Sequence, residues 1–428
     1  MAKQLFKRWQ EKNTDIKASQ VFVPGGVPTV TYNPRDEYKL EESVKEASEN
    51  LSKLLVITGP TKSGKTVLVD KIYPRDDTVW IDSGSVSNED SFWDLIVDQL
   101  GGYTEFETED AEEDALDGQV ESGISVGKLM KLETKAKIGV SDTRRKTEIM
   151  RHKSGNKTIA LSILNEAKIP VVVDDFHYLE KELQKSIVRA LKGPIMHGLP
   201  VIFIAIPSRR YDAIEVEKEM TGRIRNISMP KWEKEDLCHI AETGFKVLNV
   251  NIPDEIIENM ALKAYGSPFL MQEFCRSLCK WNDIHEVCKE ELQIDKNFEM
   301  SNIYKELADD TGQPVFNRLK RGPRARKDRK IRNLKSGAEM DIYGIVMESL
   351  KEIKPGISSL KYEDLRNNIK AILDEEPPRK NEITRVLDKI AEISYTESSS
   401  APIIDWRKDE DILTITDPFF AFYLEWAS

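Results

Sequence analysis

The sequence lacks a long hydrophobic run, because no apolar stretch approaches the ~20 residues that a membrane-spanning helix needs. Its first residues also lack the apolar segment of a secretory signal peptide. Cysteine is scarce, with four in 428 residues. Cys275 and Cys279 lie four apart, but no second ligand pair with zinc spacing follows, which favours buried, reduced thiols over a zinc site. We therefore expect a cytoplasmic protein with no membrane contact.

Positive net charge is also absent, since the formal charge of the chain is −11. This balance argues against indiscriminate binding to nucleic acid. One segment departs from it: residues 318–335 hold ten Lys and Arg residues and one Asp. A concentrated basic segment on an acidic chain indicates a specific anionic partner or an acidic surface of the same chain.

One stretch carries the strongest chemical signal. Residues 54–58 are apolar and β-branched, as in a buried strand, and residues 67–72 can continue as a helix. Between them lies a G-x-x-x-x-G-K-T sequence, which in this context is the phosphate-binding P-loop, or Walker A motif. We expect Lys65 to reach the β- and γ-phosphates and Thr66 to ligate Mg²⁺. The expected nucleotide-binding residues are Gly59, Pro60, Thr61, Lys62, Ser63, Gly64, Lys65, Thr66 and Val67.

A second motif ends another apolar strand. Residues 169–173 lead directly into Asp174 and Asp175, the form of a Walker B strand. Asp174 would hold Mg²⁺ through water, and Asp175 would orient or deprotonate the attacking water. The alternative is that the two carboxylates only cap a helix that starts near Tyr178.

Two arginines are further catalytic candidates. Residues 200–206 form another apolar strand, which ends in a segment containing Arg209. Because neighbouring parallel strands open onto one edge of a sheet, we expect Arg209 beside the γ-phosphate. Arg223 follows a turn, and an Arg there would reach a neighbouring subunit's nucleotide as an arginine finger, typically worth ~10³ to 10⁵ in rate. A surface Arg that closes a helix is an equally weighted alternative.

Two regions flank this core. Residues 1–50 are interpreted either as a tethering arm or as the adenine-side wall of the pocket, with Arg35 near the nucleotide. Residues 105–117 contain eight acidic residues and no basic one, and residues 119–140 alternate weakly as in a β-hairpin. We expect this insertion, at about 103–150, either to be functional or to make only oligomer contacts.

The rest of the chain is mainly helical by pattern. Residues 231–315 have helical periodicity and form a predicted lid, and residues 316–338 form a basic linker. In residues 339–428 three helices precede two short strands, the order of a winged helix, and an aromatic helix closes the chain. The core is therefore assigned to residues 51–230.

These motifs resemble those of the STAND and AAA-type P-loop ATPases, particularly prokaryotic members related to origin-recognition and archaeal ATPases. The resemblance implies an α/β fold with a parallel sheet of the 51432 type, a nucleotide-sensing helical lid and a C-terminal winged helix. It also implies ATP and Mg²⁺ as cofactors and ATP-dependent oligomerisation. Asp175 stands where many AAA-type motors have Glu, which predicts slow turnover. Besides the Walker motifs, the resemblance rests on a sensor-like segment at 207–209, a lid G-x-P element whose Pro268 would lie against the base, and Thr416-Asp417-Pro418-Phe419.

Three functions are compatible with these motifs. The first is an ATP-hydrolysing switch that forms homo-oligomers and regulates or senses a partner or effector protein, as in signalling or prokaryotic antiviral defence. The second is an ATP-dependent DNA loader or remodeller, and the third a nucleotide-binding scaffold with little hydrolysis. DNA and protein are equally weighted as ligands of the winged helix. The predicted DNA-contacting residues are Arg318, Lys320, Arg321, Arg324, Arg326, Lys327, Arg329, Lys330 and Arg332.

Overall fold

The computed structural model describes residues 16–49, 52–101, 155–206, 222–324, 329–397 and 402–427. The predicted insertion at about 103–150 and Arg209 lie outside these ranges. The chain forms two compact units. The first, here called the α/β unit, consists of Lys39–Gly59 and Lys65–Met229; the second, the helical unit, consists of Met1–Tyr38, Pro60–Gly64 and Pro230–Ser428. Among the described residues, no helix combines the length and hydrophobicity needed to cross a membrane.

A five-stranded parallel sheet forms the centre of the α/β unit, in the order β2-β3-β4-β1-β5. Every residue of β1, β3 and β4 is buried, as expected for strands covered on both faces. This order confirms the predicted P-loop core. The strands are β1 (Leu54–Thr58), β2 (Val79–Asp82), β3 (Val171–Asp174), β4 (Val201–Ala205) and β5 (Ile224–Ser228).

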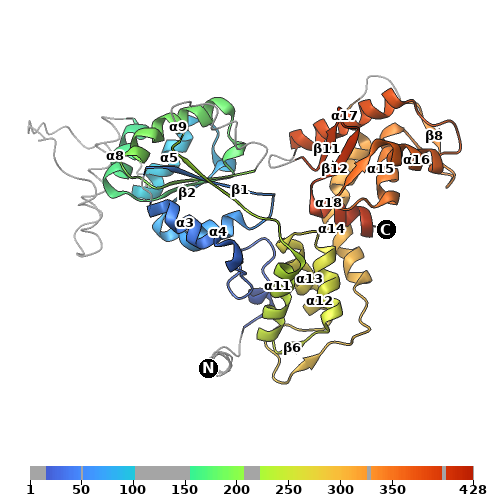
Figure 1. The fold of residues 1–428 in the computed structure, drawn as a ribbon, viewed down its shortest axis with the longest axis horizontal. Helices are drawn as coiled ribbons and strands as arrows, with labels where there is room; N and C mark the ends of the chain where they lie inside the picture. The colour runs from blue at the N-terminus through green and yellow to red at the C-terminus, as the bar shows by residue number, and fades with distance from the viewer. Residues whose placement is uncertain are drawn as a thin grey trace, which may run out of the picture. The chain divides into compact units, whose positions relative to one another are not determined.

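Helices cover both faces of this sheet (Figure 1). One face packs against α5, α8 and α9 and the other against α3 and α4, and each face has its own hydrophobic cluster. The helices are α3 (Leu40–Glu49), α4 (Lys65–Ile72), α5 (Glu89–Gly101), α8 (Asn156–Ala167) and α9 (Lys181–Met196). Short 3₁₀ turns are η2 (Arg75–Asp77), η3 (Ser83–Ser85) and η4 (Phe176–Tyr178).

The first part of the helical unit contains the predicted lid. Helix α13 begins where the sequence predicts, because Ser267 caps it by accepting a hydrogen bond from Leu270 N and Pro268 occupies its first turn. The elements are α2 (Ala18–Val21), η1 (Asp36–Tyr38), α11 (Lys234–Val247), β6 (Val250–Asn251), α12 (Asp254–Lys263), α13 (Pro268–Trp281), β7 (Leu292–Gln293) and α14 (Ser301–Arg321). Helix α14 ends at Gly322, which has φ of 62°, so residues 316–321 of the predicted linker are helical.

The second part is the predicted winged helix, with a three-stranded antiparallel sheet in the order β10-β12-β11. The closing helix α18 packs on α14, and the contact is close: a Cβ atom on Gly312 would lie 2.2 Å from Tyr423. The elements are β8 (Arg332–Asn333), β9 (Glu339–Met340), α15 (Ile342–Ile353), β10 (Ser359–Lys361), α16 (Tyr362–Ile372), α17 (Lys380–Glu397), β11 (Ile404–Arg407), β12 (Ile412–Ile415) and α18 (Pro418–Trp426).

Candidate nucleotide-binding site

Lys65 opens helix α4 directly after the loop, and its side chain lies inside the α/β unit. The residue is 7% exposed, and its ammonium donates a hydrogen bond of 3.1 Å to Gly59 O. Burial lowers the pKa of Lys65 to about 8, although the charges of Asp175 and Asp174 act in the opposite direction. The loop thus holds a buried cation among backbone groups, a suitable partner for phosphate oxygens.

Thr66 and the two Walker B carboxylates meet at the carboxyl edge of the sheet. The Thr66 hydroxyl donates to Asp174 Oδ1 at 3.3 Å, and Asp174 is 9% exposed. Burial raises the pKa of Asp174 against the opposing hydrogen bond from Thr66. Burial, followed by the charge of Asp174, raises the pKa of Asp175 to about 6. The structure therefore brings together Lys65, Thr66 and both carboxylates, as the two motifs predict.

The donor atoms at this edge fit Mg²⁺. A hydroxyl and a carboxylate are hard oxygen ligands, and Mg²⁺ usually takes only one or two protein ligands besides phosphate and water. Within the described ranges, no group of three or more His, Cys, Asp or Glu residues could hold a metal by itself. Thr66 and Asp174 would therefore hold the ion together with the nucleotide's phosphates.

Asp82 is a third carboxylate at the same edge, and the sequence motifs did not reveal it. Strands β2 and β3 pair in register, which sets Asp82 opposite Asp174. The charge of Asp82 contributes to the raised pKa values of Asp174 and Asp175. A single Asp at the end of a short strand is not a motif, and only the strand order shows that β2 lies next to β3.

The tip of the P-loop, Pro60–Gly64, belongs to the helical unit, where Trp232 supports it. The Trp232 indole N–H donates to Ser63 O at 2.9 Å. The guanidinium of Arg35 lies over the Trp232 ring, 4.4 Å from its centroid, and donates to Pro230 O and Lys231 O. Arg35 is 2% exposed, and this burial lowers its pKa. Arg35 thus supports the loop through Trp232, and its predicted contact with the nucleotide remains a prediction.

Two other predicted site residues take different positions. Pro268 lies in the first turn of α13, and its predicted contact with the base stays a prediction. Arg223 precedes β5, and its carbonyl accepts from Leu54 N at the start of β1. Because the strands are parallel, Arg223 lies at the amino edge of the sheet, opposite the edge that carries Asp174. Within its own subunit, Arg223 is therefore remote from the Walker residues.

Much of the predicted DNA-contacting segment is neutralised within the chain. Four of its nine predicted cations form ion pairs with acidic side chains of the winged helix, and Arg326 and Lys327 lie outside the described residues. One of the four, Arg332, is only 6% exposed. This favours the interpretation of a linker held by its own chain. The pairs are Lys320–Glu348 at 2.6 Å, Arg329–Asp341 at 2.6 Å, Lys330–Glu375 at 3.2 Å and Arg332–Glu382 at 3.7 Å.

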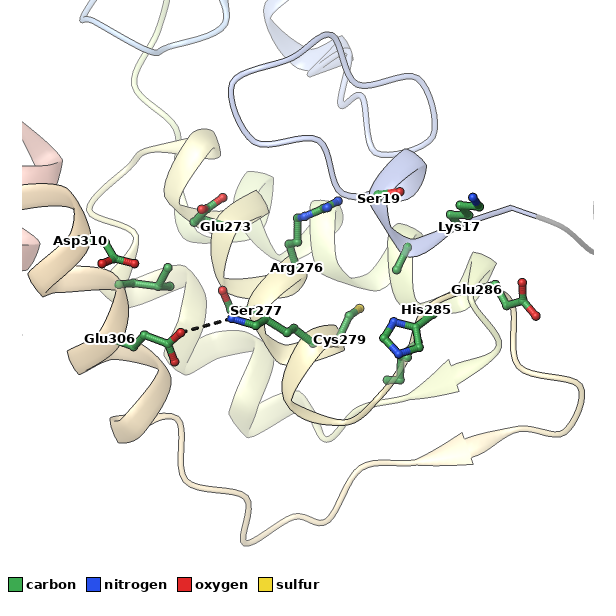
Figure 2. Close-up of a pocket in the computed structure, with 14 residues that line it drawn as sticks. Lys17, Ser19, Glu273, Arg276, Ser277, Cys279, His285, Glu286, Glu306 and Asp310 are labelled. Carbon is green, nitrogen blue, oxygen red and sulfur yellow. Dashed lines mark hydrogen bonds and ion pairs between the residues drawn. The ribbon is translucent and has the colours of Figure 1, made fainter.

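The helical unit also contains a cavity of about 590 Å³, lined by residues of α2, α13 and α14 (Figure 2). Its lining mixes charges, and Glu306, labelled in Figure 2, forms an ion pair of 3.3 Å with Lys280. Oε2 of Glu273 is buried with no hydrogen-bond partner among the described residues, and burial raises the pKa of this carboxyl. No Walker residue lines the cavity. The residues that line it come from separate parts of the chain, so they form no motif in the sequence.

No family model and no curated protein sequence matches the chain. Among solved structures, the chain is similar to the Walker-type ATPase PABY2304 of Pyrococcus abyssi, with 14% identity, a TM-score of 0.52 and coverage of 91% of this chain and 95% of that one. It is also similar to Cdc6p of Pyrobaculum aerophilum (14% identity, TM-score 0.42, coverage 95% and 97%). A third match is the Aeropyrum pernix Orc1 protein in complex with DNA (11% identity, TM-score 0.44, coverage 95% and 96%).

The fold, the strand order and the two motifs together define the class of this protein. It has the fold of the P-loop ATPases, with a parallel five-stranded core and a winged helix that follows a helical lid. The similarity at 14% identity establishes this shared fold, and the chemistry must be argued from the residues of the site.

Proposed function

We propose that this protein binds ATP with Mg²⁺ and hydrolyses it slowly, as a molecular switch. The meeting of Lys65, Thr66, Asp174 and Asp175 at one sheet edge is the observation that carries the proposal. Lys65 would bind the β- and γ-phosphates, and Thr66 and Asp174 would hold Mg²⁺. The bound ion supplies charge stabilisation to the phosphoryl group when it is transferred.

Asp175 is proposed as the residue that orients the attacking water and accepts its proton. With a pKa of about 6, this carboxyl is mostly ionised at pH 7 and can serve as a base. Aspartate is one methylene shorter than glutamate, so its carboxylate reaches less far towards the water. We infer slow turnover from that difference.

Oligomerisation on ATP belongs to the same proposal. Arg223 lies at the sheet edge opposite Asp174, so it can complete an active site only in a neighbouring subunit. Its role as an arginine finger therefore requires a head-to-tail contact between copies of the chain. Turnover should then rise more steeply than linearly with protein concentration, and Arg223→Ala should remove that rise.

For the winged helix we propose a protein partner rather than DNA. The ion pairs that occupy Lys320, Arg329, Lys330 and Arg332 support this choice, because cations already paired release fewer counterions on binding DNA. Charged side chains of α17 and the wing are also paired, as in Lys408–Asp388 at 3.3 Å. The partner would contact this mixed-charge surface and change the output of the switch.

Calorimetric titration with ATP tests the nucleotide site directly. Wild-type protein should bind ATP in a Mg²⁺-dependent manner, and Lys65→Ala should lose most of that affinity, because its phosphate ligand is missing. Lys185→Ala changes a surface lysine on α9 and serves as the control. Equal ATP affinity in Lys65→Ala and wild type would show that the phosphate site is misplaced.

A further inference from the structure

The cavity beside α13 has no part in the proposed ATPase reaction. All of its lining residues belong to the helical unit, and none is a Walker residue. Its volume of about 590 Å³ falls within the range of pockets that hold drug-sized ligands. A molecule bound there would not need the nucleotide site.

The walls of the cavity come from separate segments that hydrogen bonds join. Residues 17–19 form one wall, and α13 and α14 form two others (Figure 2). Ala18 N donates to His285 O at 2.8 Å, which fixes the first wall to the segment after α13. The guanidinium of Arg276, on α13, donates to Phe22 O at 3.3 Å. The cavity is therefore a part of the fold and needs no rearrangement to form.

Part of the lining is apolar. Ala18, Cys279, Ile284 and Leu307 are each at most 9% exposed, and all four belong to the hydrophobic cluster of the helical unit. Contact with such a surface favours a ligand with an apolar body, because the contact removes apolar area from water.

Acidic side chains gather at one end of the cavity. Figure 2 shows Glu273, Glu306 and Asp310 on the same side of it. Lys280 pairs with Glu306, whereas Oε2 of Glu273 is buried with no hydrogen-bond partner among the described residues. A buried carboxylate oxygen without a donor is unfavourable, and an ammonium group in the cavity would offset its charge.

Cations line the opposite end. Lys17 lies there, and the side chain of Arg276 extends towards it from α13 (Figure 2). Glu286 lies opposite Lys17 in a β-bridge, and its charge offsets one of these two cations. One positive charge remains in excess, which suits a carboxylate group of a ligand.

We propose that this cavity binds a small zwitterionic molecule with an apolar body, of the chemical class of a short apolar peptide with free ends. Its ammonium would lie near Glu273 and Asp310, and its carboxylate near Arg276 and Lys17. Each charge of the ligand then faces the opposite charge of the protein. A ligand with charge of one sign only would meet like charge at one end of the cavity.

The test uses the full chain and the tripeptide trileucine, whose two charged ends can be blocked separately. Calorimetric titration without nucleotide compares trileucine with its N-acetyl and C-amide forms, so the result does not depend on the proposed ATPase function. Glu273→Gln removes the charge of the carboxylate but keeps the size of the side chain. Glu255→Gln, at an exposed position of α12, is the matched control.

Trileucine should bind saturably, and each blocked form should bind roughly ten- to a hundredfold more weakly, the range of a charged hydrogen bond. Glu273→Gln should weaken binding of trileucine by about tenfold and reduce the effect of acetylation but not that of amidation. Glu255→Gln should change neither. No saturable binding, or equal binding of the free and blocked forms, would overturn the proposal. Equal affinity in Glu273→Gln and Glu255→Gln would also overturn it, because the peptide would then bind elsewhere.

Discussion

The carboxyl edge of the sheet and the basic segment both carry dense charge, yet the two regions organise it differently. At the sheet edge, Lys65 and the carboxylates of Asp174 and Asp175 lie close together and are partly desolvated, which shifts their pKa values. In the basic segment, four cations, Arg329 among them, are each paired with an acid of the winged helix. Perturbed titration marks a site that can do chemistry, whereas matched pairs mark a surface that holds itself together.

The largest predicted effect concerns the sheet edge. Asp175→Asn removes the proposed base but keeps the size of the side chain, so we expect turnover to fall by roughly 10² to 10⁴ with ATP binding retained. Phosphate release under saturating ATP measures the change, and Asp98→Asn, on the exposed side of α5, is the control. Unchanged hydrolysis in Asp175→Asn would remove this residue from the mechanism.

The second prediction concerns the packing that holds the start of the basic segment. Gly312→Ala places a methyl group against Tyr423, so we expect it to lower the free energy of unfolding by about 1 to 3 kcal/mol. Gly155→Ala is the control, because a Cβ there meets nothing within 4 Å, and its cost should stay below ~1 kcal/mol. Urea unfolding followed by tryptophan fluorescence compares them. Similar losses in both variants would mean that α14 and α18 do not pack closely in solution.

The third prediction attempts to turn the basic segment into a DNA-binding surface. The double variant Asp341→Asn with Glu375→Gln removes the acidic partners of Arg329 and Lys330, so binding to duplex DNA should strengthen and become more salt-dependent. The slope of log K against log salt should steepen by about 0.9 for each cation that loses its acidic partner. The control is the double variant Asp98→Asn with Glu290→Gln, which has the same charge change elsewhere. It should not change the slope of log K against log salt. Strong, steeply salt-dependent binding by wild type would contradict the matched-pair account.

The smallest predicted effect tests the support beneath the P-loop. Trp232→Phe keeps a ring for Arg35 to cover but loses the N–H that bonds to Ser63 O. One hydrogen bond contributes about 1 kcal/mol, so ATP affinity should fall by roughly fivefold. Titration with ATP measures the loss. An affinity equal to that of wild type would show that Trp232 does not position the loop.

Local motifs account for what the sequence could predict. The strand before Lys65, the strand before Asp174 and the cap at Ser267 are each defined by a few neighbouring residues, and the structure has them as expected. The parallel order followed from the resemblance of these motifs to known ATPases. The residues within one strand or at one helix end determine such features, so they can be predicted from a single sequence.

Long-range pairings were beyond the sequence. Three features join residues distant in the chain: the register of Asp82 with Asp174, the acids that pair with the basic segment, and the contact of Lys62 with the Phe419 ring. Composition shows ten cations in residues 318–335 but not which carboxylates lie beside them. The amino-edge position of Arg223 likewise depends on strand direction, which charge and spacing do not reveal.

The most direct test is steady-state ATP hydrolysis by the purified chain, with Mg²⁺ and with chelator, in the presence and absence of duplex DNA at physiological salt. The account predicts slow turnover that requires Mg²⁺, disappears in Lys65→Ala and does not respond to DNA. No Mg²⁺-dependent turnover at any protein concentration would contradict the proposed hydrolytic switch. Strong stimulation by DNA would contradict the assignment of the winged helix to a protein partner.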